Sequence, residues 1–102
     1  MTDYLILHKI DPIFFLPQSD PDGQHMVVQN EYDRIAIVTA DSLDEVFEKT
    51  NHIYEDWTKN DGVSMIVKGA RSTSVGDLVL NMDTLDLVIC APIGWKPAVW
   101  VG

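Results

Sequence analysis

Residues 34–51, RIAIVTADSLDEVFEKTN, decide the fold, because a strand pattern passes directly into a helix pattern within them. The apolar, β-branched run over residues 34–40 predicts a strand that is buried on both faces. Ser42, followed three residues later by Glu45, matches a capping box, in which the serine side chain accepts a hydrogen bond from the glutamate amide and the glutamate side chain reaches back to the serine amide. The stretch therefore predicts a central strand followed at once by a capped helix.

The helix has a clear apolar face. Leu43, Val46, Phe47 and Thr50 recur at helical spacing, and acidic residues in the first turn suit the positive end of the helix dipole. We predict that this helix runs from Leu43 to about Asn51 and packs on the sheet. A continuation to Trp57 with a break is the alternative.

Apolar runs separated by turn residues predict the remaining strands. The turns are marked by Asp-Pro-Asp-Gly at residues 20–23 and by Asn-Asp-Gly at residues 60–62. We predict one α+β domain over residues 1–102, with an antiparallel sheet of about five strands and one capped helix. The candidate strands are residues 4–10, 34–40, 63–67, 75–80, 85–91 and 97–101, and residues 26–28 are either a short edge strand or a loop.

The net charge of −9 is concentrated in one part of the sequence. Residues 1–40 carry a net charge of −4 and residues 41–61 a net charge of −5, whereas residues 62–102 are neutral. Nucleic-acid affinity depends on Lys and Arg displacing counterions from phosphates. We therefore expect no direct nucleic-acid binding and no adhesion to an anionic membrane.

Neither targeting signals nor paired cysteines are recognisable. No run approaches the 18 apolar residues of a membrane span, and Asp3 stands where a signal peptide would be basic. The single cysteine, Cys90, lies in an apolar run and is expected to be a buried core residue. We expect a cytoplasmic protein.

No metal, cofactor or catalytic constellation is predicted. The three histidines, His8, His25 and His52, are too far apart for the paired ligand spacing of a metal site. His52 has a structural explanation, because a cation near a helix C-terminus complements the dipole. No glycine-flanked nucleophile elbow surrounds Ser72 or Ser74.

The most unusual segment is Arg71-Ser72-Thr73-Ser74-Val75-Gly76-Asp77. Ser72 and Ser74 could satisfy backbone amides in a tight loop, and Gly76 could permit a close backbone approach. Asp77 could hold the loop by accepting amide hydrogen bonds. A structural loop is the simpler interpretation. The alternative is a binding loop in which Arg71 is presented to an anionic partner.

This segment also resembles a known family. Thr50-Asn51-His52, Trp57, the segment from Arg71 to Val79, and Gly94-Trp95 resemble the YodL-like small proteins, related to uncharacterised proteins of phages and mobile elements. The resemblance covers about residues 43–97. It implies a compact α+β fold and a mobile-element origin, with no established catalytic residues. The candidate binding residues are Arg71, Ser72, Ser74, Asp77, His52, Trp57 and Trp95.

Three functions are consistent with the sequence. The first is a small phage-type accessory protein that binds a host protein, such as a nuclease or another defence factor. Its acidic contact face would comprise Asp44, Glu45, Glu48, Glu55 and Asp56. The second is a structural or assembly module, with Trp100 at a homodimer interface because tryptophan is favoured at interface centres. The third, a small enzyme or ligand-binding protein, would use the Arg71 to Asp77 loop.

Overall fold

A mixed sheet organises the chain, and a computed structural model describes residues 1–12, 15–51 and 56–101. Seven strands and one α-helix are found within these residues. The elements are β1 (Thr2–Lys9), β2 (His25–Val28), η1 (Gln29–Glu31), β3 (Tyr32–Ala40), α1 (Leu43–Lys49), η2 (Trp57–Lys59), β4 (Val63–Met65), β5 (Leu78–Asn81), β6 (Leu87–Cys90) and β7 (Trp95–Val101).

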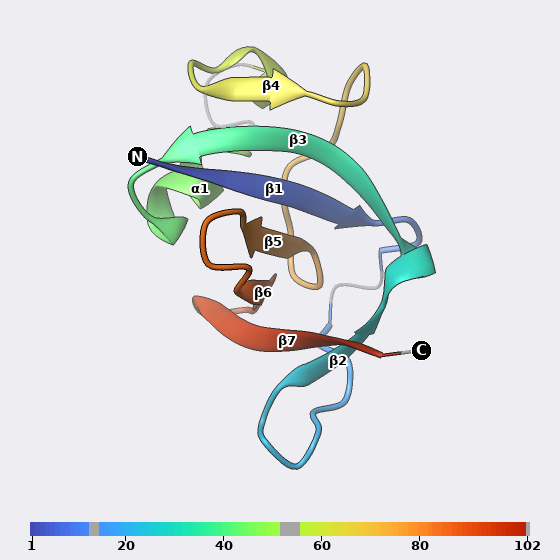
Figure 1. Ribbon diagram of the computed structural model, residues 1–102. Coiled ribbons are helices and arrows are strands. Elements are labelled where there is room, and N and C mark those ends of the chain that lie inside the picture. The colour runs from blue at the N-terminus through green and yellow to red at the C-terminus, as the bar shows by residue number, and fades with distance from the viewer. Residues whose placement is uncertain (13–14, 52–55, 102) are drawn as a thin grey trace.

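The strand order is β2-β7-β6-β5-β1-β3-β4. Every neighbouring pair is antiparallel except β2 and β7, which run parallel. The short helix η1 joins β2, at one end of this order, directly to β3 near the other end. The sheet therefore curls back toward itself, as the ribbon in Figure 1 shows.

Tyr32 fixes the corner at which β2 passes into β3. Its ring packs edge-on against Trp100 of β7, with 6.3 Å between ring centroids. Its hydroxyl donates to the carbonyl of Gly76 at 2.8 Å. Burial raises the pKa of Tyr32 to about 12, so this hydroxyl stays protonated and remains a donor at neutral pH.

The prediction of one small domain with a helix on a sheet is confirmed, but that of about five antiparallel strands is wrong. The unexpected parallel pair joins β2 to β7, which are far apart in the sequence. Parallel strands need a long connection, so no turn signal marks their pairing. β2 is also only four residues long, which leaves little alternation to recognise.

Several element boundaries also differ from the prediction. β6 begins at Leu87, because Leu85 adopts a φ of 65° and lies exposed in the preceding turn. β5 begins at Leu78, because the glycine at 76, with a φ of 96°, lies in a turn. α1 ends at Lys49, and Thr50 is its C-cap. The continuation toward Trp57 falls partly on residues 52–55, outside the described residues.

Alternation along β1 divides the core between the two faces of the sheet. Tyr4 and Ile6 belong to a cluster that also contains Val46 of α1 and Trp57 of η2. Leu7 belongs to a second cluster on the curled inner side, with the following residues of the other strands: Val27, Tyr32, Leu78, Leu87, Ile89 and Ala98. Strand side chains alternate between faces, so β1 contributes to both clusters.

The predicted cap at Ser42 forms, but the Glu45 side chain does not reach back to close the capping box. Ser42 Oγ accepts from the amide of Glu45 at 3.2 Å, and Val46 is fully buried against the sheet. The Glu45 carboxylate pairs with Lys49 Nζ at 3.2 Å, one turn along the helix. Phe47 is the exception to the predicted apolar face, because 41% of it remains exposed.

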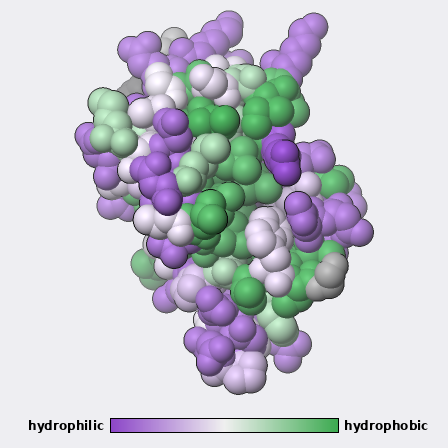
Figure 2. Space-filling model, in the orientation of Figure 1, coloured by the Kyte–Doolittle hydropathy of each residue, from purple (hydrophilic) through white to green (hydrophobic). Residues whose placement is uncertain are grey.

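The surface seen in Figure 2 is mixed. Hydrophobic residues form a band across the middle of this face, and hydrophilic residues flank it. α1 lies behind the sheet in the same orientation (Figure 1). Among the described residues, none of the helices is both long enough and apolar enough to span a membrane.

Candidate functional site

Asp77 is the centre of a buried polar network. The residue is 1% exposed, and its carboxylate accepts from the backbone amides of Lys9 and Ser74, each at 2.8 Å. Arg71 donates to both carboxylate oxygens, through Nη1 to Oδ2 at 2.5 Å and through Nη2 to Oδ1 at 2.8 Å. A carboxylate with this many donors is fixed in place.

Arg71 is committed to the same network. Besides Asp77, its guanidinium donates to the carbonyls of Ser72 at 3.0 Å and Lys9 at 3.2 Å. Its own carbonyl accepts from Trp57 Nε1 at 2.7 Å. The hydrogen bonds to Asp77 raise the pKa of Arg71 further above its ordinary value. Most of its hydrogen-bonding capacity is therefore used within the protein.

The loop around these two residues is held by its own polar groups. Ser74 Oγ donates to the carbonyl of Ser72 at 3.3 Å, and the Thr73 amide donates to Thr50 at the end of α1 at 2.9 Å. The amide of Cys90 donates to the carbonyl of Asp77 at 2.8 Å. The arrangement ties the loop to β1, β6 and α1, which favours the structural interpretation of residues 71–77.

His8 lies beside this network in an apolar setting. It is 4% exposed, its Nε2 is 3.0 Å from Thr73 Oγ1, and its ring packs against Trp57 with 6.2 Å between centroids. Burial lowers the pKa of His8 to about 4, an effect that the nearby Asp77 carboxylate opposes and that Arg71 reinforces. His8 is therefore neutral at physiological pH.

This neutral histidine predicts a loss of stability in mild acid. Unfolded His8 takes up its proton near pH 6.5, whereas folded His8 does so only near pH 4, so stability present above pH 6.5 declines between these two values. Going from pH 7 to pH 5, we expect wild type to lose about 2 kcal/mol more unfolding free energy than His8→Gln. Urea denaturation at both pH values measures the difference. An equal loss in the two proteins would contradict it.

The other candidate binding residues are dispersed. Trp57 is completely buried, which makes it a core side chain rather than part of a contact surface. Trp95 lies at the start of β7, is only partly buried, and packs against the cluster that contains Trp57. His52 and Glu55 lie outside the described residues. The structure thus joins Arg71, Ser72, Ser74 and Asp77 by hydrogen bonds, and Trp57 reaches the same network through the carbonyl of Arg71.

The acidic residues do not collect on one face either. The turn that contains Asp20 and Asp22 precedes β2 and projects at the bottom of Figure 1, far from α1. Asp56 caps η2 by accepting from the amide and hydroxyl of Thr58. Glu45 is paired with Lys49. Of the predicted acidic contact face, Asp44 and Glu48 remain without a described cation within 4.0 Å.

Asp44 and Glu48 line an open hollow, which we call the α1 groove. The hollow has a volume of about 370 Å³ and lies between α1 and the turn that joins β6 to β7. Phe47 and Trp95 form an aromatic wall in edge-to-face contact, with 6.3 Å between centroids and an interplanar angle of 80°. The residues that line it are Asp44, Phe47, Glu48, Cys90, Ala91, Pro92, Gly94 and Trp95.

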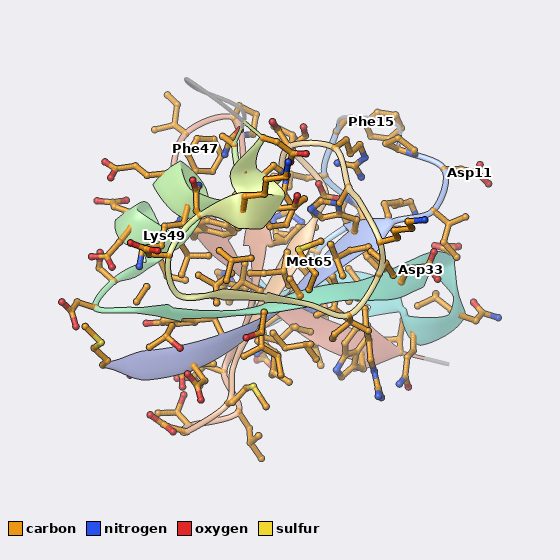
Figure 3. The ribbon with its side chains drawn as sticks, turned by 90° about the horizontal axis from the view of Figure 1, so that it is seen from above. Asp11, Phe15, Asp33, Phe47, Lys49 and Met65 are labelled. Carbon is orange, nitrogen blue, oxygen red and sulfur yellow. The ribbon has the colours of Figure 1, made fainter. Side chains whose placement is uncertain are left out.

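The α1 groove lies far from Phe15, another exposed aromatic side chain (Figure 3). Figure 3 shows Phe47 and Lys49 at the α1 end of the molecule, whereas Asp11, Phe15 and Asp33 lie toward the other end. Cys90 borders the groove but is 4% exposed, and burial raises the pKa of its thiol to about 11. The thiol is therefore protonated at neutral pH and is a poor nucleophile.

No family model, curated protein or solved structure has significant similarity to this chain. The resemblance to YodL-like proteins therefore stays a prediction, and the site rests on geometry alone. Within the described residues, no three His, Cys, Asp or Glu side chains come together in a way that could hold a metal ion.

Sequence reasoning missed Phe47 as a surface residue, because its helical spacing assigned it to the core. A signal was nevertheless present. Phe47 is flanked by acids at 44, 45 and 48, so the apolar stripe of the helix is narrow and Phe47 lies at its edge. The contact between Phe47 and Trp95 joins residues 48 positions apart, which helical periodicity cannot reveal.

Proposed function

We propose that this protein acts by binding a protein partner through the α1 groove. The observation that carries the proposal is the pairing of two carboxylates, Asp44 and Glu48, with a partly exposed aromatic wall, Phe47 and Trp95. Partly exposed aromatic side chains are typical of the centres of protein contacts. Charged groups beside them orient the partner and raise the association rate.

The net charge favours a partner with a basic surface. A charge of −9 attracts such a surface over long range and raises the association rate, an effect that salt weakens. The resemblance to proteins of phages and mobile elements indicates which class of partner to expect. We propose a host protein, such as a nuclease or another nucleic-acid-binding defence factor, whose basic groove this protein would occupy.

Affinity purification with two matched variants tests this proposal. Asp44→Asn with Glu48→Gln removes two negative charges from the α1 groove, whereas Asp11→Asn with Asp33→Asn removes two at the other end of the molecule (Figure 3). We expect a stoichiometric host partner to be retained by wild type and by the Asp11/Asp33 variant, and to be lost with the groove variant.

Two results would overturn the proposal. One is recovery of no stoichiometric protein by the wild type from lysate of its natural host. The other is equal loss of the partner in both double variants, because net charge rather than the α1 groove would then govern binding.

Self-association is a second candidate, favoured by a different surface. Trp100 is 36% exposed and borders a hollow of about 420 Å³ on β6 and β7, which Leu85 and Pro97 also line. A homodimer that covers this surface would bury the tryptophan. Sedimentation equilibrium at high micromolar protein concentration tests this proposal. A molecular mass equal to that of the monomer would eliminate it.

A further inference from the structure

The α1 groove carries two carboxylates, and among the described residues no cation pairs with either. This charge favours a cation as the occupant. Asp44 and Glu48 are one helical turn apart, so two like charges face the same hollow, and such pairs repel. Glu48 also lies in the last turn of α1, where the helix dipole disfavours an acid. By contrast, Glu45 on the neighbouring face is neutralised by Lys49. A cation in the groove would relieve both unfavourable terms.

The aromatic wall restricts which cation fits. Phe47 is 41% exposed and Trp95 is partly buried, so both rings offer surface to an occupant of the groove. A bare metal ion is disfavoured, because among the described lining residues only Asp44 and Glu48 bring carboxylates to the hollow, and aromatic rings supply no oxygen ligand. A guanidinium group suits the site, since it stacks on aromatic rings and donates in its plane to carboxylates.

A second, separate hollow has lining residues next to those of the α1 groove in the sequence. This hollow, of about 160 Å³, is lined by Leu43 of α1 and Val88 of β6, with Asp86 at its edge. Leu43 adjoins Asp44, and Val88 lies two residues before Cys90 on the same strand, so both hollows are lined by residues of α1 and β6. The second hollow thus also has a carboxylate, that of Asp86. An extended segment that carries more than one cation could therefore pair with both hollows.

We infer that the α1 groove binds an arginine side chain from an extended, basic segment of the partner protein, with the guanidinium against the Phe47–Trp95 wall and its N–H groups directed to Asp44 and Glu48. This assignment rests on the proposed function and names the chemistry that the partner must present. Arginine is preferred over lysine because an ammonium cannot stack and donate in one plane.

Titration with three short peptides tests the assignment. The probes are acetylated and amidated Gly-Ser-Arg-Gly-Arg-Ser, the same peptide with lysine at both arginine positions, and the same peptide with the neutral isostere citrulline. Two-dimensional ¹H–¹⁵N spectra of the whole labelled protein report where each peptide binds. We expect shifts at the Trp95 indole and the α1 amides, with little change at the Trp57 and Trp100 indoles.

The expected affinities separate the contributions. Arginine should bind about fivefold more tightly than lysine and about tenfold more tightly than citrulline. Asp44→Asn with Glu48→Gln should weaken the arginine peptide about tenfold, and Asp11→Asn with Asp33→Asn less than twofold. Phe47→Ala should reduce the preference for arginine over lysine, since it removes part of the stacking surface while both carboxylates remain.

Equal binding of the arginine and citrulline peptides would overturn the assignment, and so would shifts that map outside the α1 groove. The binding function and the assignment of arginine as its anchor can be contradicted separately. A host protein lost only with the Asp44/Glu48 variant, together with no preference for the arginine peptide, would sustain the binding function and eliminate arginine as the anchor.

Discussion

Replacing Asp77 with alanine is expected to lower the free energy of unfolding by about 3–5 kcal/mol, because it breaks a buried ion pair from one side. The guanidinium of Arg71 would lose its partner, and the amides of Lys9 and Ser74 would lose their acceptor. Urea denaturation followed by circular dichroism measures the change. Asp33→Ala is the matched control, since Asp33 is exposed on β3, and its effect should stay within about 0.5 kcal/mol.

A double-mutant cycle shows whether the pair acts as a unit. Arg71→Ala should cost less than Asp77→Ala, because the carboxylate would keep its two amide donors and Arg71 is 33% exposed. The double variant should be at least about 1 kcal/mol more stable than the sum of the single effects predicts. If Asp77→Ala instead abolished partner binding while leaving stability unchanged, the loop would be a binding site rather than a structural element.

Replacing Trp57 with alanine is the second large effect that we expect, again about 3–5 kcal/mol. The side chain is completely buried in the cluster that joins α1 to the sheet, and its Nε1 donates to the carbonyl of Arg71. The variant would leave a large cavity beside His8, whose ring packs against the indole. Thermal and urea unfolding both report the loss.

Two further variants make this result interpretable. Trp100→Ala removes the same side chain from a site that is 36% exposed, and should cost roughly 1 kcal/mol. Trp57→Phe keeps most of the ring packing but leaves the carbonyl of Arg71 without its donor, at a cost of about 1–3 kcal/mol. The second variant remains measurable if the alanine variant does not fold. Equal costs for Trp57→Ala and Trp100→Ala would contradict the assignment of Trp57 to the core.

Features that depend on neighbouring residues in the sequence were predicted correctly. The cap at Ser42 and the burial of Val46 follow from spacings within a few residues, and both are present. The role of Asp77 as an acceptor of loop amides was also predictable, because aspartate before a strand commonly closes a tight loop. The bidentate partner Arg71 lies six residues away and belongs to the same loop.

Contacts between residues far apart in the sequence could not be predicted from such signals. The parallel ladder between β2 and β7 depends on how the whole sheet curls, and the short run over residues 25–28 carries no trace of it. The contact between Phe47 and Trp95, which makes the wall of the candidate site, likewise needs β7 to pass the open side of α1. The sequence supplied the acids of the α1 groove but not its shape.

The pairing of β2 with β7 also has a consequence for synthesis. Val28 aligns with Val101, so this ladder, at one end of the strand order, joins the first third of the sequence to β7. A nascent polypeptide must therefore hold the backbone edge of β2 unpaired until β7 has left the ribosome. Translation that stops before residue 95 would release a chain in which β2 has no partner strand and β6 has an unpaired edge, a form suited to aggregation or proteolysis rather than to binding.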